Sequence, residues 1–348
     1  MTNVTSFPGR KITVDASKKL YFGGTAYLGL QQHKQFLKVY IDNIKKYGTN
    51  YGASRKSNIK ISVYDKAEKY LAKIVNSEAC VTVSSGYLAG QLVCDYFKSE
   101  GHSLFYAPNS HIALHQQKTK NYTTYKELAN AIDNYLKISN IPPVIFLDSI
   151  DFNGLNYPSF IGLQKLPLDK IIVVADDSHA LGLSLNNGAG CYSQLKELKP
   201  KELLVCSSLG KGFAIQAGAI FGGSKRIEEL KNTAFFGGAS PATPANLATL
   251  LNADAIYTKR QKKLQQHILL FLEGIQTKDK FSYMPNHAAF TYNDQKITTY
   301  LEKHNIIVTS FNYPDKDSPT MSRIVLSAHH KKKDINKLIT LINTLYNL

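Results

Sequence analysis

The sequence of 348 residues has no tryptophan, only three methionines and only four cysteines. The cysteines are scattered, with no CxxC pair and no spacing typical of a metal site. Disulfide-rich secreted proteins and zinc modules cluster their cysteines, so both classes are disfavoured. We therefore expect buried free thiols in a reducing compartment, and a cytoplasmic protein. The four residues are Cys80, Cys94, Cys191 and Cys206.

Long apolar runs are also lacking. No stretch approaches the roughly 20 apolar residues that a helix needs to span a bilayer. Residues 1–7 lack the basic flank and the apolar run of a signal peptide. We expect no membrane span.

Acidic residues are also few relative to basic ones. Lysine and arginine outnumber aspartate and glutamate by 42 to 26, which gives a net charge of +16. Such a charge is common in nucleic-acid-binding proteins, but here the lysines are spread along the chain. The densest runs, 259–263 and 331–333, lie on predicted helices or at their ends. We interpret them as solvated helix faces and expect no nucleic-acid partner, although the same charge would also attract an anionic substrate such as a nucleotide thioester.

What the sequence does contain is an alternation of short apolar runs with helical stretches and loops. A length of 348 residues is enough for one large domain and a smaller one, and the hydrophobic fraction of 43% is ordinary for a globular protein. The alternation is typical of an α/β domain with a largely parallel sheet. The predicted strands of this domain are 79–83, 104–106, 144–147, 171–175, 203–206 and 219–221.

Helical spacing of apolar residues predicts helices at about 33–47 and 62–75, a long helix from 244 to 272, and a last helix from Asp334 to Leu345. Asp334 is a candidate cap of that last helix.

Three segments follow from this pattern. Residues 1–45, with strand signals at 12–14 and 19–22, form an arm that joins the small domain. Residues 46–243 form the large domain, and 244–348 form a linking helix and a small α+β C-terminal domain.

Polar residues follow the predicted strands at their carboxyl ends, which is where ligands collect in open α/β sheets. Lys211 follows one such strand and stands between Gly210 and Gly212. A partly desolvated lysine amine is a candidate for Schiff-base chemistry. A surface lysine in a turn is the alternative interpretation.

The other strand ends carry carboxylates, histidines and small residues. Asp176 and His179 follow a buried strand directly, and buried carboxylates without partners are costly, so they suggest a site. A helix cap by Asp177 or Ser178 is the simpler interpretation of that segment. The remaining strand ends hold Ser84–Gly90, Asn109–His111 and Asp148–Ser149.

Taken in order, these motifs resemble the α-oxoamine synthases, which are pyridoxal phosphate (PLP) enzymes of fold type I and include 8-amino-7-oxononanoate synthase, 2-amino-3-ketobutyrate CoA ligase, 5-aminolevulinate synthase and serine palmitoyltransferase. The resemblance covers about residues 12 to 345. Asp-Asp-Ser-His followed some thirty residues later by Ser-Leu-Gly-Lys-Gly is its most specific part. The motifs are Tyr27–Leu30, Gly52–Arg55, Ser85–Tyr87, Ser110–His111, Asp176–His179 and Ser208–Gly212.

The resemblance implies a mostly parallel, seven-stranded-type sheet in the large domain. It also implies roles at a PLP site. Lys211 would hold the cofactor covalently and later move the Cα proton of the substrate. Asp176 would pair with the pyridine nitrogen, His179 would bond the phenolic oxygen, and His111 would stack on the ring.

The resemblance assigns the remaining contacts as well. Ser85, Gly86 and Tyr87 would bind the phosphate together with the Ser208 hydroxyl. Ser149 would lie near the cofactor oxygen. The Arg323 side chain would hold the substrate carboxylate, and its alternative interpretation is a surface arginine in a strand.

The implied reaction condenses an amino acid with an acyl-CoA or another acyl thioester, releasing CoA and carbon dioxide, in a homodimer with shared active sites. An aminotransferase of the same fold is the first alternative. A basic nucleic-acid-binding protein or an inactive scaffold on this fold is the second.

The chain departs from the family pattern in three places. The N-terminal helix that usually precedes the first strand is missing, since that strand is already predicted to begin at Ile12. Ile59 and Tyr64 stand near the family's glycine and histidine. Gly237-Gly238 stand where the family has the Ser-Thr that reaches the neighbouring subunit's cofactor phosphate.

Overall fold

The computed structural model describes residues 3–115, 122–152, 154–183, 185–313 and 316–346. The chain folds into two compact units. The large unit comprises Lys38–Asp151 and Leu155–Asp254. The small unit comprises Met1–Leu37, Phe152–Gly154 and Ala255–Leu348.

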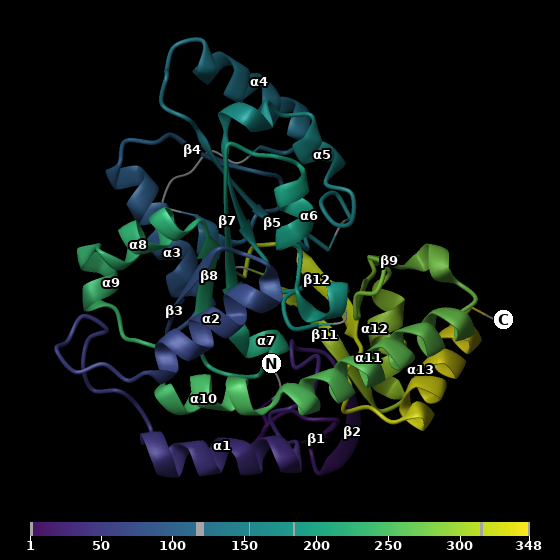
Figure 1. Cartoon of the computed structure of the whole chain (residues 1–348). Helices are drawn as coiled ribbons and strands as arrows, with labels where there is room; N and C mark the ends of the chain where they lie inside the picture. The colour runs from purple at the N-terminus through teal and green to yellow at the C-terminus, as the bar shows by residue number, and fades with distance from the viewer. Residues whose placement is uncertain (1–2, 116–121, 153, 184, 314–315, 347–348) are drawn as a thin grey trace. The chain divides into compact units, whose positions relative to one another are not determined.

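The large unit is built on a six-stranded sheet (Figure 1) in the order β3-β8-β7-β6-β5-β4. Strands β4 to β7 are parallel, and β8 runs antiparallel to both β7 and β3. The strands are β3 Ala79–Val83, β4 Leu104–Tyr106, β5 Val144–Asp148, β6 Ile172–Asp176, β7 Glu202–Ser208 and β8 Gly218–Gly222.

The predicted α/β fold with a mostly parallel sheet is confirmed, but the sheet has six strands among the described residues, where seven were expected. The strand interiors are almost wholly buried, as in β6 and β8, because helices cover a parallel sheet on both faces.

Helices of the large unit pack around this sheet. Helix α3 packs on β7 and β8, and α8 packs on β3. The described helices are α1 Lys34–Tyr47, which begins in the small unit, α2 Val63–Val75, α3 Gly86–Ser99, η1 Ile112–Leu114, α4 Tyr125–Leu136, α5 Ile161–Gln164, η2 Leu168–Lys170, η3 Leu185–Gly188, α6 Tyr192–Glu197, α7 Leu209–Gly212, α8 Ser224–Lys231, α9 Ala234–Gly238 and α10 Pro244–Asn252.

The long helix predicted over 244–272 is two helices. α10 ends at Asn252, because the next residue, Ala253, has a φ of −112° and a ψ of 12°, outside the helical region, and α11 covers Asp254–Gly274. α10 packs on α2, and the Tyr64 hydroxyl donates to the Ala242 carbonyl at 2.8 Å. These contacts assign α10 to the large unit, so the border follows Asp254 and does not fall at 243/244.

The small unit has a second six-stranded sheet in the order β1-β2-β11-β12-β10-β9. β2 pairs in parallel with β11, so both N-terminal strands belong to this sheet, and the remaining neighbours are antiparallel. Its elements are β1 Lys11–Val14, β2 Ser17–Phe22, α11, η4 Lys278–Lys280, β9 Ser282–Tyr283, β10 Ala289–Thr291, α12 Gln295–Lys303, β11 Ile306–Asn312, β12 Thr320–Val325 and α13 Lys332–Leu345.

Asp334 joins two parts of the small unit. Its carboxylate accepts the Lys331 backbone N–H at 2.7 Å at the start of α13, which is a capping contact. The same carboxylate accepts two bonds from the Arg10 guanidinium, at 2.5 and 2.6 Å. The predicted cap therefore also attaches the N-terminal segment to the last helix.

All four cysteines are free and buried, as predicted. Within the described residues, no helix is both long and apolar enough to cross a membrane. The described part of the chain also holds no group of three or more His, Cys, Asp or Glu side chains suited to a metal ion.

Candidate active site

Lys211 lies in the short helix α7, directly after β7. Its Nζ is 2.9 Å from Nε2 of His179, which follows β6. β6 and β7 are parallel neighbours, so their carboxyl ends lie at the same edge of the sheet. The structure thus brings together two residues that are 32 positions apart in the sequence.

The turn after β6 is attached to the turn after β7. Asp176 Oδ1 accepts the Ser178 backbone N–H at 2.8 Å, and Ser178 Oγ accepts the Ser208 backbone N–H at 2.8 Å. Neither Asp177 nor Ser178 caps a helix among the described elements. The simpler interpretation of this segment is therefore wrong, and its side chains hold the two turns in register.

His111 lies near both Asp176 and Lys211. Burial lowers the pKa of its imidazole, with a smaller lowering from Lys211 and an opposing rise from Asp176. Its backbone N–H donates to Asp148 Oδ2 at 2.6 Å, and its Nδ1 accepts the Ala113 N–H at 3.1 Å. These contacts fix the loop and favour a neutral ring beside the lysine.

Asp148 is a member of this cluster to which the motifs gave no role. Burial, with a further contribution from the Asp176 charge, raises the pKa of its carboxyl well above the usual range. Its position at the end of β5, beside Asp176 in the register, was the available signal.

Ser149 is fully buried, and its hydroxyl donates to the Asp177 carboxylate and to the Asp176 carbonyl, the latter at 3.1 Å. Asp177 also accepts the Cys191 N–H at 2.9 Å. Burial raises the pKa of Asp177 to about 7, against the lowering effect of these bonds. The sequence suggested Asp177 only as a helix cap, because its partners lie 28 and 14 residues away. The role of Ser149 at the cofactor stays a prediction.

The N-terminus of α3 lies against the turn that carries Ser208. Ser85 caps the helix, since its Oγ accepts the Leu88 N–H at 3.1 Å. A Cβ on Gly86 would lie 2.6 Å from Ser208 Cβ, so only glycine permits this approach. Tyr87 follows in the first turn of α3 and is 57% exposed. A helix N-terminus beside a serine is a suitable anion site.

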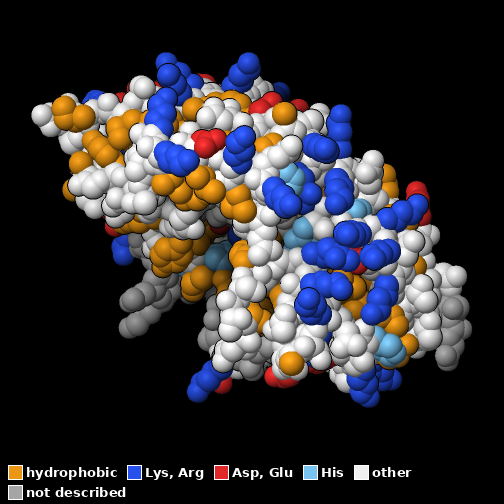
Figure 2. All heavy atoms as spheres, turned by 90° about the horizontal axis from the view of Figure 1, so that it is seen from below, with side chains coloured by type: hydrophobic (Ala, Val, Ile, Leu, Met, Phe, Trp, Pro, Cys, Tyr) orange, Lys and Arg blue, Asp and Glu red, His pale blue; other side chains and the backbone are white. Residues whose placement is uncertain are grey.

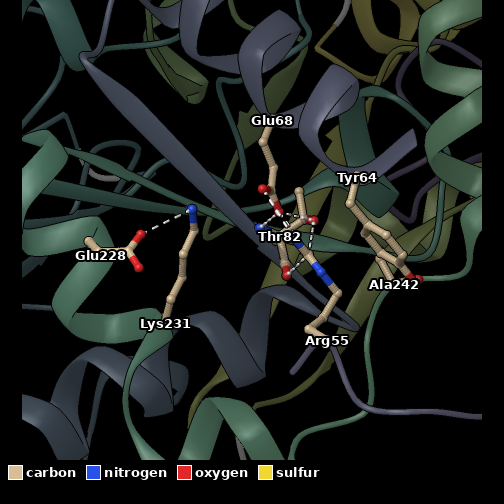
Figure 3. A network of polar contacts seen from close by, with 7 residues as sticks. All are labelled: Arg55, Tyr64, Glu68, Thr82, Glu228, Lys231 and Ala242. Atoms are coloured by element: carbon tan, nitrogen blue, oxygen red, sulfur yellow. Dashed lines mark hydrogen bonds and ion pairs between the residues drawn. The ribbon is translucent and has the colours of Figure 1, made fainter. Parts of the chain in front are cut away.

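Contacts of Ser54 and Arg55 hold the Gly52–Arg55 loop in the large unit. Ser54 Oγ donates to the Gly237 carbonyl at 2.6 Å, so this loop contacts the segment that departs from the family pattern. Arg55 forms a buried ion pair with Glu68 at 2.8 Å, and its guanidinium lies 4.0 Å from the centre of the Tyr64 ring (Figure 3).

Arg323 belongs to the small unit and lies on β12. Its guanidinium carbon is 3.6 Å from the centre of the Phe152 ring. It is half-buried and lines a pocket of that unit, so it is not a freely exposed surface arginine.

The residues of the large unit fit PLP by their donor chemistry. An amine, a carboxylate and two imidazoles come together near the start of a 14-residue helix that is capped by a serine. Lys211, Asp176, His179 and His111 would serve the ring and its aldehyde. The start of α3 and Ser208 would receive the phosphate.

No family model matches the sequence. The chain does have curated relatives. An 8-amino-7-oxononanoate synthase of Petrotoga mobilis is 25% identical over 358 residues, covering 95% of this chain and 89% of that protein. A serine palmitoyltransferase of Sphingobacterium spiritivorum is 25% identical over 255 residues, covering 70% of this chain and 63% of that protein.

Solved structures agree with these relatives. A serine palmitoyltransferase from S. paucimobilis, solved with bound PLP, superposes with a TM-score of 0.79 at 15% identity, covering 99% of this chain and 91% of that one. An 8-amino-7-oxononanoate synthase from Francisella tularensis gives 0.72 at 20% identity, covering 94% and 98%.

The fold is thus that of the PLP-dependent transferases of fold type I. The sequence relatives and the structural neighbours are α-oxoamine synthases, which confirms the resemblance that the motifs indicated.

Proposed function

We propose that this protein is a PLP-dependent acyltransferase that condenses an amino acid with an acyl thioester, releasing CoA and carbon dioxide. The observation that supports this most is the contact of Lys211 Nζ with His179 at 2.9 Å, at a sheet edge that also holds Asp176 and His111. Relatives named for such condensations favour this reaction over the aminotransferase alternative.

PLP, when bound, would supply a sink for the electron pair left on the substrate Cα. The protein's own residues would do the rest. Lys211 would attach the cofactor and move the proton at Cα, with His179 as a hydrogen-bond partner that orients the amine. The His111 ring, neutral because burial lowers its pKa, would offer a flat uncharged face. Arg323 would hold the substrate carboxylate by two parallel hydrogen bonds.

We further propose a cytoplasmic homodimer. Four buried free thiols suit a reducing compartment. Each active site would be completed by the second copy, with the backbone of Gly237 and Gly238 in place of the family's hydroxyls. Sedimentation of the purified protein tests the dimer, and a monomer that turns over substrate would contradict it.

Two measurements test the reaction. Incubation with amino acids and acyl-CoAs should release free thiol, whereas keto-acid formation without thiol release would favour transamination. Borohydride treatment and peptide mass analysis should locate PLP on Lys211. Lys211→Ala should lose both the label and at least about 10³-fold in turnover, because the base and the anchor disappear together. Lys225→Ala, at a lysine that is 92% exposed, is the matched control.

A further inference from the structure

The small unit carries most of the net positive charge of the protein. It contains 19 of the 42 lysine and arginine residues but only 8 of the 26 aspartate and glutamate residues. Figure 2 shows Lys and Arg side chains gathered around His side chains on part of the surface. The proposed reaction gives no role to this charge.

Arg260 lies on helix α11 and is only 9% exposed. Its Nε donates to the Leu28 carbonyl at 2.7 Å, and its Nη2 lies 3.5 Å from the Gly29 carbonyl oxygen. Among the residues that the structure describes, no carboxylate forms an ion pair with this guanidinium. A buried charge without a counter-ion is costly, so a bound anion would stabilise it.

His329 and Arg260 pack against the same turn. Gly29 has a φ of +57°, and a Cβ at that position would lie 2.9 Å from Arg260 Nη2 and 2.6 Å from His329 Cβ. Glycine is therefore needed there both for its backbone conformation and for the space it leaves. Three segments of the small unit meet at this turn: the N-terminal segment, α11 and the segment between β12 and α13.

Lys263 and His33 complete a group that we call the Arg260 cluster, which consists of Arg260, Lys263, His33 and His329. Lys263 follows Arg260 by three residues on α11 and so lies on the same side of the helix. Burial and the Arg260 charge lower the pKa values of Lys263 and His33. Burial, with help from His330 and Arg260, also lowers the pKa of His329. An anion between these groups would relieve their mutual repulsion.

Asp334 is a carboxylate that approaches the cluster, and its charge raises the pKa of Lys263 against the effects of burial and of Arg260. Its oxygens are already bonded, however, to the Arg10 guanidinium at 2.5 and 2.6 Å and to the Lys331 N–H at 2.7 Å. Arg10 therefore matches the Asp334 charge. Arg260 and Lys263 are left without an ion pair in the described part of the chain.

The groups that remain in the cluster are hydrogen-bond donors. His33 Nδ1 accepts the Phe36 N–H at 3.4 Å, so the neutral ring carries its proton on Nε2. Arg260 has further N–H groups beyond the two that face the carbonyls, and Lys263 has three. A phosphoryl group offers several acceptor oxygens and a charge near −2, which suits donors and two cations together.

We propose that the Arg260 cluster binds a phosphoryl anion, held by Arg260 and Lys263 through charge and by the two histidines through hydrogen bonds. This inference does not rest on the proposed condensation, because none of the four residues belongs to the Lys211 site. Free diphosphate and the diphosphate of a nucleotide present the same oxygens to the cluster. A singly charged carboxylate is a poorer match, since it neutralises only one of the two cations.

The test is calorimetric titration of the purified protein, first saturated with PLP so that the proposed phosphate site of the large unit is filled. Pyrophosphate, ADP and formate are the probes, at matched ionic strength. Pyrophosphate should bind at least about tenfold more tightly than formate, because it engages both cations. Formate binding as tightly as pyrophosphate would overturn the proposal.

Variants assign the binding to the cluster. Arg260→Met should weaken pyrophosphate binding by at least about tenfold, and Lys263→Met by about three- to tenfold. Lys262→Met, at an exposed lysine on the same helix, removes the same charge as Lys263→Met and should stay within about twofold of the wild type. Equal weakening in Lys262→Met and Lys263→Met would assign the binding to diffuse surface charge and would overturn the proposal.

A melting curve of each variant establishes that it is folded. If Arg260→Met does not fold, Lys263→Met and His329→Gln leave the buried guanidinium in place and still decide the matter, since both should weaken pyrophosphate binding relative to Lys262→Met. Comparison of ADP with pyrophosphate separates the two sources of the ligand. Tighter binding of ADP that depends on Lys263 would assign the cluster to a nucleotide, and tighter binding of pyrophosphate would assign it to free diphosphate.

Discussion

At the scale of single residues, the two glycines that flank Lys211 have different physical roles. A Cβ on Gly212 would lie 2.1 Å from the Leu181 carbonyl oxygen, which is backbone and cannot move cheaply. A Cβ on Gly210 would meet Ser208 Oγ at 3.5 Å, which is ordinary contact. Close packing thus fixes the residue only on the C-terminal side of the lysine.

Gly212→Ala should destabilise the protein by about 1–3 kcal/mol, because the backbone must shift to relieve the overlap. It should also move Lys211 and weaken PLP binding. Gly210→Ala should stay within about 0.5 kcal/mol of the wild type. Denaturant unfolding and PLP titration measure both effects, and equal losses in the two variants would contradict this assignment.

Asp177 makes stability depend on pH. Its pKa is raised by burial to about 7 in the folded protein, so its contribution is full below the unfolded value near 4 and is lost as the pH rises through 7. Asp177→Asn removes the titrating carboxyl. The decrease in unfolding free energy between pH 4 and 8 should therefore be smaller in this variant than in the wild type, by up to about 4 kcal/mol.

Asp279→Asn, at an exposed aspartate whose side chain is 72% accessible, is the control for this series. Unfolding in urea at several pH values provides the measurement. An unchanged slope in Asp177→Asn would show that the carboxyl does not titrate in this range.

At the scale of elements, a buried ion pair joins the 52–55 loop to helix α2 and strand β3. Glu68 accepts two bonds from Arg55, at 2.8 and 3.2 Å, and two from the Thr82 backbone and hydroxyl, at 2.9 and 2.8 Å (Figure 3). Both side chains are about nine-tenths buried or more. A charge in that position is tolerated only because its partner is present.

Arg55→Met should therefore cost about 3–5 kcal/mol of unfolding free energy, since it leaves the Glu68 carboxylate buried without its counter-ion. Replacing both residues with Met should recover a large part of that loss. Lys231→Met breaks a pair with Glu228 at 3.6 Å, also drawn in Figure 3, whose side chains are 32% and 65% accessible, and should cost less than about 1 kcal/mol. A double variant as unstable as Arg55→Met would argue against a charge effect.

At the scale of the whole molecule, basic side chains lie near buried and half-buried histidines. Lysine and arginine side chains outnumber acidic ones on the face drawn in Figure 2. Burial, with help from Arg260, Lys263 and Arg10, lowers the pKa of His329 to about 3. Burial likewise lowers the pKa of His330 to about 4, and lowers the pKa values of His33 and His267.

Neutral buried histidines stabilise the fold above their unfolded pKa near 6.5, and this contribution is lost as the pH falls towards 3 to 4. This loss at low pH opposes the contribution of Asp177 and Asp148, whose raised pKa values favour the folded state at low pH. The contacts of His330 explain why protonation of its ring is unfavourable. Its Nδ1 accepts the Ser327 N–H at 3.0 Å, and its Nε2 bonds the Tyr21 carbonyl. Protonation of Nδ1 would remove that acceptor.

His330→Gln keeps a donor and an acceptor without titrating, so it should reduce the acid loss by up to about 3 kcal/mol between pH 6.5 and 4. His304→Gln, at a half-buried histidine bonded to the Tyr300 carbonyl, is the matched control. Thermal melting across this pH range compares the two, and parallel curves for both variants and the wild type would contradict the prediction.

Much of the large sheet and its candidate site followed from the sequence. Strand interiors such as those of β5 and β6 are continuous apolar runs because both faces are covered, so their ends could be located within a residue or two. Parallel strands place their carboxyl ends at one edge, which is why Lys211 and His179 could be expected to meet.

Only the tertiary structure decided the remaining features. The bonds of Asp177 to Ser149 and Cys191, the stacking of Arg323 on Phe152 and the break of the long helix at Ala253 join or separate residues through distant contacts. Local apolar periodicity records which face of an element is buried, but not what is packed against it. The chemistry of the Lys211 cluster could therefore be predicted from the sequence. The pocket beside Arg323 could not, because it forms only where residues from both ends of the chain share one sheet.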